Sequence, residues 1–506
     1  MSTKFMSYLI KNRKVALIFF FVIYLGIMLT PYLSGYTEVY TSNGVITASQ
    51  MSLMQIKGKF TTSLGFGVVM SMILSYALPV LLFAYVHSKK SVDLYFALPV
   101  KRSEQLITNI LFALGICFGY FFVSSLVIYL CFAIKGVSIG AYLLILLCAL
   151  VIFAIMLCIN SLLFLVANNL FDGIVMIASY SGLALVVYTI VSVFGTYIIA
   201  GTRGYDLAGK IAAYTSPLYI ASETFVNLFD RFIAGSDISF SISHIILLIV
   251  LGVVACYGLY RHFVLRKSER AEQVSNKFFA YPFVIHFYAI SCLAIIAFHA
   301  VTEGGLLSNL FVYLLLLFVY IVATFVYKRK ISVRPIYIIF YVCAMAITFL
   351  FASVAWKTRA FGLSEAYDLS KGDELTYYSY FSESTELGET ITGNINASFD
   401  TSKLDEYKEA IDILEAKRKQ SIDVFYEDDS AYSFGHIQVD NSSHSVDPIS
   451  GKERVRNLES YNYVLHDVYT IEELKILDKY CEIELHDYEI DKTYTLEEFL
   501  KVKGEK

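Results

Sequence analysis

Nine long apolar runs, separated by short polar segments, dominate the first 356 residues of the chain. A helix needs roughly 20 apolar residues to cross a hydrocarbon core of about 30 Å, and the runs meet or approach that length. They lie at 15–34, 62–87, 105–134, 139–167, 171–200, 243–264, 282–300, 305–327 and 335–356. The pattern predicts a polytopic α-helical membrane protein with about nine spans.

Residues 357–506 follow a different pattern, in which helix and strand signals alternate. Apolar residues recur at helical spacing over 402–420, and alternation over 480–485 predicts a strand. A repeated phrase, Y-T-I-E-E-L and Y-T-L-E-E-F, carries two helix-capping boxes, Thr470 with Glu473 and Thr495 with Glu498. These signals predict a C-terminal soluble α+β domain.

The composition excludes an ordinary soluble protein. Of the 506 residues, 57% are hydrophobic and only 17% are charged, whereas a soluble domain has about 25% charged residues. The chain has eight cysteines, of which only Cys481 lies in the C-terminal part. That domain therefore contains no internal disulfide, and its fold has to rest on a core.

Charge divides the chain in two. Residues 1–356 carry 23 Lys and Arg against 11 Asp and Glu, while residues 357–506 carry 17 against 33. With the N-terminus in the cytoplasm, the inner segments hold 17 basic residues and the outer loops hold six. The positive-inside rule then predicts an N-in orientation, and an odd number of spans places the acidic domain outside. Trp356 closes the last run, where an aromatic belt residue is expected.

The spans contain almost no ionisable groups. No Asp, Glu, Lys or Arg lies near the middle of a run, and His286 and His299 are best interpreted as interfacial or helix-packing residues. This argues against ion-coupled carriers and voltage sensors, which need such groups within the membrane. The stretch Gly204–Lys210 resembles a P-loop, but Ile211 stands where a Ser or Thr must reach Mg²⁺. Energy for transport therefore has to come from another chain.

The predicted cytoplasmic segment 88–104 has the features of a short amphipathic helix. We expect Ser91 to cap it, Leu94, Tyr95 and Leu98 to form its apolar face, and Pro99 to stop it. Charged residues flank this face: Asp93, Lys101, Arg102 and Glu104. Two interpretations are open, a surface helix that anchors to anionic lipid and a coupling helix that docks on a soluble ATPase.

A second basic segment follows the sixth run and is expected to continue it as a helix into the cytoplasm. Arg266, Glu269 and Arg270 then stand at i, i+3 and i+4, where salt bridges are available. Lys267 and Ser268 complete this segment.

Together, the phrases V-D-L-Y-F-A-L-P-V-K-R at 92–102 and Y-R-H-F-V-L-R-K-S-E-R-A at 260–271 resemble those of ABC-2-type permease subunits of Gram-positive bacteria. Glu272 stands where that family's second phrase leads to glycine, so the turn there is expected to differ. The resemblance implies a protein of the bacterial plasma membrane, of a subgroup with extra helices and an outer domain. The implied parts are an N-terminal amphipathic segment 1–14, a six-helix core 15–264 with coupling loop 88–104 and outer loop 201–242, a connector with three further spans 265–356, and the acidic domain 357–506.

The resemblance also implies partners. These are two copies of an ATP-binding cassette subunit, which would hold the ATP and Mg²⁺, and a second permease copy or a paralogue. This chain would bind no cofactor of its own, contact membrane lipid and no nucleic acid, and not itself be an enzyme. On this view Leu94, Tyr95 and Leu98 fill a groove on the ATPase, with Lys101 and Arg102 at its rim or on lipid.

The parts of the chain predicted to lie outside carry sequence signals that are less specific. Loop 201–242 is long and aromatic and is expected to contain a re-entrant or interfacial helix. The outward negative charge favours a cationic partner, such as a peptide. A metal site is conceivable from His436, His444, His466 and His486 with Asp440, Asp467 and Asp487, but their spacing is not that of a zinc site, and we expect solvated side chains.

The function expected from these observations is export or removal of an amphipathic compound, a peptide or a lipid-like molecule. Two alternatives stay open, a membrane sensor or scaffold and a polytopic membrane enzyme, each with an outer ligand-binding domain.

Overall fold

The computed structural model describes residues 3–33, 48–133, 139–201, 208–209, 211, 214–234, 242–273, 281–303, 305–331, 334–365, 373–384, 390–427, 435–446, 453–465, 469–487 and 492–494. Two compact units divide the chain. The first comprises 1–186, 212–287 and 323–331, and the second comprises 187–211, 288–322 and 332–506.

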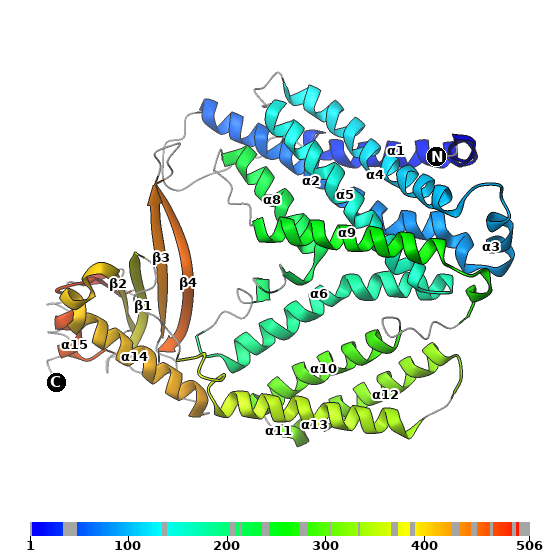
Figure 1. Ribbon diagram of the computed structural model, residues 1–506. Helices are drawn as coiled ribbons and strands as arrows, with labels where there is room; N and C mark the ends of the chain where they lie inside the picture. The colour runs from blue at the N-terminus through cyan, green and yellow to red at the C-terminus, as the bar shows by residue number, and fades with distance from the viewer. Residues whose placement is uncertain are drawn as a thin grey trace. The chain divides into compact units, whose positions relative to one another are not determined.

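Within these described ranges, nine helices are long and apolar enough to cross a membrane, in agreement with the nine predicted runs. They are α1 (Thr3–Leu33), α2 (Ala48–Phe83), α4 (Arg102–Ala133), α5 (Ile139–Val166), α6 (Leu170–Ile198), α9 (Ile242–Val264), α10 (Tyr281–Glu303), α12 (Leu310–Lys328) and α13 (Pro335–Lys357) (Figure 1). Residues 3–14 belong to the same continuous helix as the first run, so the segment 1–14 is not a separate element.

The first unit is built around α2, which contacts α1, α4, α5 and α8 (Pro217–Ala234). Its core is aromatic, with Tyr24, Phe121 and Phe153 fully buried. The Tyr24 hydroxyl donates to the carbonyl of Gly67 over 2.6 Å, and a Cβ at Gly67 would clash with Met28. The side chains of Met28 and Phe121 occupy the space that glycine leaves here, a kind of packing usual in membrane bundles.

Helix α8 occupies the loop predicted at 201–242 and confirms that this loop contains a helix. One of its faces is buried in the core of the first unit through Ile220, Ala221, Phe225 and Leu228. The P-loop-like stretch 204–210 lies almost wholly outside the described residues.

The helical part of the second unit has its own small core. The end of α6 contributes Ile198 and Ile199, α10 contributes Phe298, and α13 contributes Ala352 and Ala355. The His299 ring packs edge-on against the Tyr197 ring, with centroids 6.0 Å apart. This contact is the helix-packing role expected for His299. A single turn, α11 (Gly305–Ser308), precedes α12.

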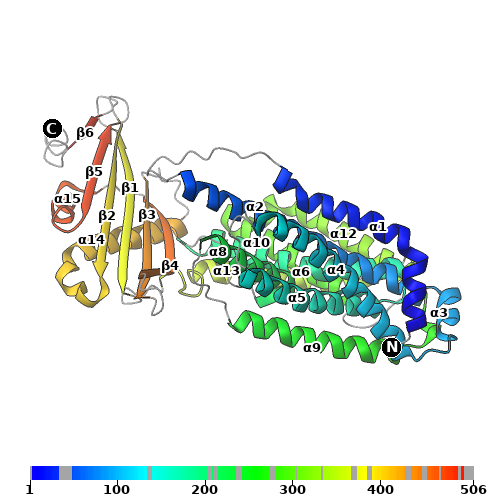
Figure 2. The same ribbon diagram turned by 90° about the horizontal axis from the view of Figure 1, so that it is seen from above.

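The C-terminal domain is α+β, as predicted. Its six-stranded antiparallel sheet has the order β4-β3-β1-β2-β5-β6. The strands are β1 (Glu374–Ser384), β2 (Thr390–Asp400), β3 (Gly435–Val446), β4 (Glu453–Leu465), β5 (Glu482–Asp487) and β6 (Lys492–Tyr494). Helices α14 (Lys408–Glu427) and α15 (Ile471–Leu477) bury their apolar residues against one face of the sheet (Figure 2).

The structure refines two local predictions in this domain. The helix expected over 402–420 begins as a 3₁₀ segment, η3 (Thr401–Tyr407), because Asp400 caps an earlier turn and Lys403 leaves the helical region. The capping box of Thr470 and Glu473 is present at the start of α15. Its repeat at Thr495 and Glu498 lies outside the described residues.

Candidate functional site

The predicted coupling segment forms a short helix, α3 (Lys89–Phe96), at one end of the helices of the first unit (Figure 1). Its N-cap is Ser88, with extended backbone, and not Ser91, which lies inside the first turn. The capping prediction was therefore wrong by three residues, because α3 begins at Lys89, directly after the 3₁₀ turn η1 (Ala84–His87) and Ser88, a full turn before the apolar face expected to start at Leu94. The helix stops at Phe96, before Pro99, as expected.

The apolar residues of α3 point in two directions. Val92 is buried, and the Tyr95 ring stacks on Tyr85 with centroids 4.1 Å apart. Leu94 is 67% exposed, and Leu98, just beyond the helix, is 37% exposed. Tyr95 therefore belongs to the interior of the unit, and only the two leucines face away from it.

The other residues predicted for the coupling site also divide into exposed and half-buried side chains. Asp93, Pro99 and Lys101 are exposed, whereas Ser91, Arg102 and Glu104 are half-buried. With Lys89 and Lys90, which are also exposed, the surface of the segment is a leucine pair bordered by three lysines and Asp93, a composition that fits both a protein contact and a lipid contact.

Arg102 fixes the C-terminal end of α3. Its guanidinium lies 4.1 Å from the centroid of the Phe96 ring. The same group donates to Val264 O, at the last residue of α9, over 3.3 Å, and to Arg266 O, two residues beyond the helix, over 2.7 Å. A cation placed on the last carbonyls of a helix also interacts favourably with its dipole.

Glu272 fixes the N-terminal end of α3. Its carboxylate accepts a hydrogen bond from the backbone N–H of Lys89 over 3.2 Å, and its own N–H donates to Asn168 O over 2.8 Å. The backbone of Glu272 is left-handed, with φ of 65°. Glycine adopts this conformation without steric cost, and the glutamate present here contributes a contact with α3 that a glycine would lack.

We name the contacts of Arg102 and Glu272 with the two ends of α3 the α3 clamp. Both residues connect α3 to the end of α9 and the segment that follows it, so both ends of α3 are bonded to the same neighbouring part of the first unit.

Arg266 extends the connection to α5. Its guanidinium is buried, 1% exposed, and donates to Leu165 O and to Ala167 O, the latter over 3.0 Å. Burial, with the nearby charge of Arg270, lowers the pKa of Arg266 to about 10, so that it is still a cation at neutral pH. Arg266 thus caps the C-terminal end of α5, although about a hundred residues separate the two in the sequence.

The rest of the second basic segment differs from the prediction. Helix α9 ends at Val264, and only a 3₁₀ turn, η2 (Ser268–Arg270), follows. The helical spacing expected for Arg266, Glu269 and Arg270 is therefore absent, because Arg266 turns inward to the carbonyls of α5. Lys267, Glu269 and Arg270 are exposed, and Ser268 is half-buried.

One polar cluster escaped the sequence analysis. Asp172, in the first turn of α6, accepts a hydrogen bond from the Tyr281 hydroxyl over 3.2 Å and lies 3.7 Å from the Arg329 guanidinium. It joins the starts of α6 and α10 to the end of α12 within the first unit. The signal in the sequence was an acidic residue at the start of the apolar run 171–200, three residues after Asn169.

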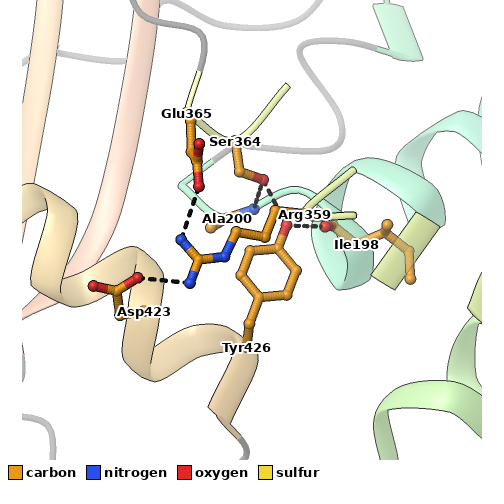
Figure 3. Close-up of polar contacts among 7 residues, drawn as sticks. All are labelled: Ile198, Ala200, Arg359, Ser364, Glu365, Asp423 and Tyr426. Atoms are coloured by element: carbon orange, nitrogen blue, oxygen red, sulfur yellow. Dashed lines mark hydrogen bonds and ion pairs between the residues drawn. The ribbon is translucent and has the colours of Figure 1, made fainter. Parts of the chain in front are cut away.

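The second unit contains a set of polar contacts that we name the domain anchor, drawn in Figure 3. The hydroxyl of Tyr426, on α14, donates to Ile198 O over 2.6 Å, and Ser364 Oγ lies 2.5 Å from the same hydroxyl. Ser364 Oγ also accepts the N–H of Ala200 over 3.1 Å. Burial raises the pKa of Tyr426, so its hydroxyl stays protonated and available as a donor.

Arg359 completes the domain anchor. Its guanidinium makes two ion pairs of 2.8 Å, one with Glu365 and one with Asp423 of α14 (Figure 3). Trp356, at the end of α13, packs against Phe425 and Tyr426 with centroids 5.6 and 4.9 Å away. The exits of α6 and α13 are thus both bonded to the same helix of the C-terminal domain.

The chain leaves α13 through a left-handed turn. Arg359, Ala360, Phe361 and Gly362 have φ values of 52°, 57°, 58° and 81°. Three consecutive non-glycine residues in this region cost about 1–2 kcal/mol each. Ala360 is fully buried in the small helical core, and Phe361 packs on Phe351, so the surroundings impose the turn.

The histidines considered for a metal site are separated in the structure. His436 is on β3 and His486 is on β5, with β1 and β2 between them. Among side chains in the described ranges, no three His, Cys, Asp or Glu are grouped closely enough to hold a metal ion. His466 and Asp467 lie outside those ranges, as do the side chains of His444 and Asp487.

Comparison of the chain with family models, with curated proteins and with solved structures finds no match.

Proposed function

We propose that the protein is the membrane-spanning permease subunit of an ABC transporter, energised by separate ATP-binding subunits that dock on α3. The observation that carries this proposal is the α3 clamp together with the exposed Leu94. An amphipathic helix that is fixed at both ends, and shows a leucine to the outside, has the properties needed to pass a movement from a soluble partner to the bundle.

The proposed orientation follows from the loop charges. The segments predicted to share a side of the membrane with α3 carry 17 Lys and Arg, against six in the segments predicted on the other side, which favours a cytoplasmic position for α3 and the N-terminus. With nine spans, the acidic C-terminal domain is then extracytoplasmic, on a bacterial plasma membrane. ATP and Mg²⁺ belong to the partner subunits, and a second permease copy or a paralogue completes the membrane unit. The proposed cargo is an amphipathic compound, a peptide or a lipid-like molecule, that is exported or removed.

Affinity purification of the tagged full chain from its native membrane tests the proposal. Wild-type protein should retain a subunit with a P-loop sequence, identified by mass spectrometry, and ATPase activity. Leu94→Asp should lower the recovery of that subunit about thirtyfold, the effect of losing an interface hot spot of about 2 kcal/mol.

Ile331→Asp provides the matched control. Ile331 is 87% exposed in the segment between α12 and α13, expected on the same side of the membrane. Retention of the ATPase by Ile331→Asp and its loss by Leu94→Asp would support docking on α3. Equal recovery with both variants, or no ATPase with the wild-type chain, would overturn the proposal and favour the sensor or scaffold alternative.

A further inference from the structure

The sheet of the C-terminal domain has one face that neither α14 nor α15 covers. Alternation along β1 places Leu375, Tyr377 and Phe381 in the core with these helices. The residues between them, including Tyr378 and Tyr380, point to the opposite side and are half-buried. We name this side the open face.

Aromatic rings form the centre of the open face. The Tyr380 and His436 side chains are paired across β1 and β3, and their rings stack with centroids 5.6 Å apart. Tyr378 lies 5.9 Å from the same His436 ring, and its hydroxyl donates to Asn394 Oδ1 on β2 over 3.2 Å. Two tyrosine rings are therefore held in place at the surface rather than packed in a core.

Carboxylates border these rings on both sides. Glu482 and Glu484 on β5 are exposed, and the register sets them beside Asn396 and Asn394. Asp440 on β3 lies across from Thr376, and its shielded Oδ1 has no hydrogen-bond donor among the described residues. None of the described side chains that the register places on this face is a Lys or Arg.

We propose that the open face binds a cationic peptide in an extended conformation. A Lys or Arg side chain would pair with Glu482 or Glu484, and another would lie over the ring of Tyr378 or Tyr380. Strand β5 lies two strand spacings, about 10 Å, from β1. That distance is covered by about three residues of an extended peptide, so side chains of one short peptide reach both groups.

Charge complementarity is the reason to prefer this partner. The described side chains of this face include carboxylates but no Lys or Arg, a composition that creates a negative potential and attracts cations. Aromatic faces add to that attraction only for cations or for stacked rings. The amides of Asn394 and Asn396 can bond to a peptide backbone between the two groups. The inference does not depend on ATPase docking, because binding to the full chain alone is the property measured.

The test uses the purified full chain in lipid nanodiscs and a fluorescent peptide of about twelve alternating Arg and Trp residues, long enough to cross the sheet. Fluorescence anisotropy should show saturable binding that weakens with added salt. Glu482→Gln with Glu484→Gln should weaken the affinity about fivefold, the effect of losing two exposed ion pairs. Glu406→Gln with Glu409→Gln removes two exposed charges from the helical side and should leave the affinity unchanged.

A second pair of variants isolates the aromatic contribution. Tyr378→Leu should weaken binding about threefold, whereas Tyr378→Phe, which keeps the ring, should not. Three results would overturn the proposal: a Glu-Trp peptide binding as tightly as the Arg-Trp peptide, equal losses in the two double-glutamine variants, or displacement of the peptide by chitohexaose. The last would identify the open face as a sugar-binding surface.

Discussion

The carboxylate of Glu272 accepts a hydrogen bond from the backbone N–H of Lys89 over 3.2 Å, while Glu272 itself holds a φ of 65°. One residue thus combines a backbone conformation suited to glycine with a side chain that caps the start of α3. Left-handed backbone is unfavourable for glutamate by about 1–2 kcal/mol, so the capping contact offsets a local strain.

This combination predicts that two substitutions at position 272 will change the stability by different amounts. Glu272→Ala keeps the strain and loses the contact with α3, whereas Glu272→Gly loses the contact but relieves the strain. We expect Glu272→Ala to lower the unfolding free energy by about 1 kcal/mol more than Glu272→Gly. Thermal unfolding measures the difference, and hydrogen exchange of residues 89–92 should accelerate in both variants. Equal stability of the two variants would contradict the strained geometry.

The domain anchor predicts a local loss of protection at the end of α6. Ser364→Ala removes the acceptor of the Ala200 N–H, and Tyr426→Phe removes the donor to Ile198 O. Each substitution should cost about 1 kcal/mol, since a buried polar group loses its partner. Hydrogen exchange of residues 198–201 should become about five- to tenfold faster. Ser402→Ala, at an exposed position of the same domain, should not change it.

A buried ion pair within α14 is hydrogen-bonded to the sheet through Tyr377 of β1. The Glu415 carboxylate receives hydrogen bonds from Arg418 Nε at 3.0 and 2.9 Å and from the Tyr377 hydroxyl at 2.6 Å. Glu415→Gln leaves Arg418 buried without its counter-ion and should lower the unfolding free energy of the C-terminal domain by about 3–5 kcal/mol. Glu409→Gln, at an exposed position of the same helix, should change it by less than about 0.5 kcal/mol. Denaturant unfolding followed by tyrosine fluorescence compares the two.

The buried thiol of Cys481 makes the stability of the C-terminal domain depend on pH. Burial raises the pKa of its thiol from 9.0 to about 12. The folded domain keeps this proton where the unfolded chain releases it, so this group's contribution to stability falls as the pH rises above about 9. Because only the thiolate reacts, alkylation of Cys481 at pH 9 should be at least tenfold slower in the folded than in the unfolded chain. Mass spectrometry of the peptide that contains Cys481 follows the reaction, and similar rates in the two states would refute the burial.

Several elements were predictable because their signals are local. The number of consecutive apolar residues decides whether a run can span a bilayer, and the nine apolar helices of the described ranges follow from those numbers. The short helix before Pro99 and the capping box at Thr470 also depend on neighbours within a few positions. The α+β nature of the C-terminal domain followed from the alternation of the two periodicities.

Other features were out of reach because they join residues far apart in the chain. No residue near Arg266 in the sequence indicates that its side chain turns to carbonyls at the end of α5. The local spacing alone therefore predicted that the helix continues through this segment. The inward position of Tyr95 depends on Tyr85 across a turn. Trp356 was expected at a membrane interface, and its packing against Phe425 needs the folded domain.

The sequence by itself determined the spans, the two-part charge distribution and the class of the C-terminal domain, since these depend on transfer of apolar groups from water and on local backbone preference. Only the tertiary structure decided which side of α3 is exposed, how Arg102 and Glu272 hold its ends, and which tyrosines line the open face of the sheet. Those relationships come from strand register and from carbonyls left unpaired at helix ends, whose partners are selected by proximity in space.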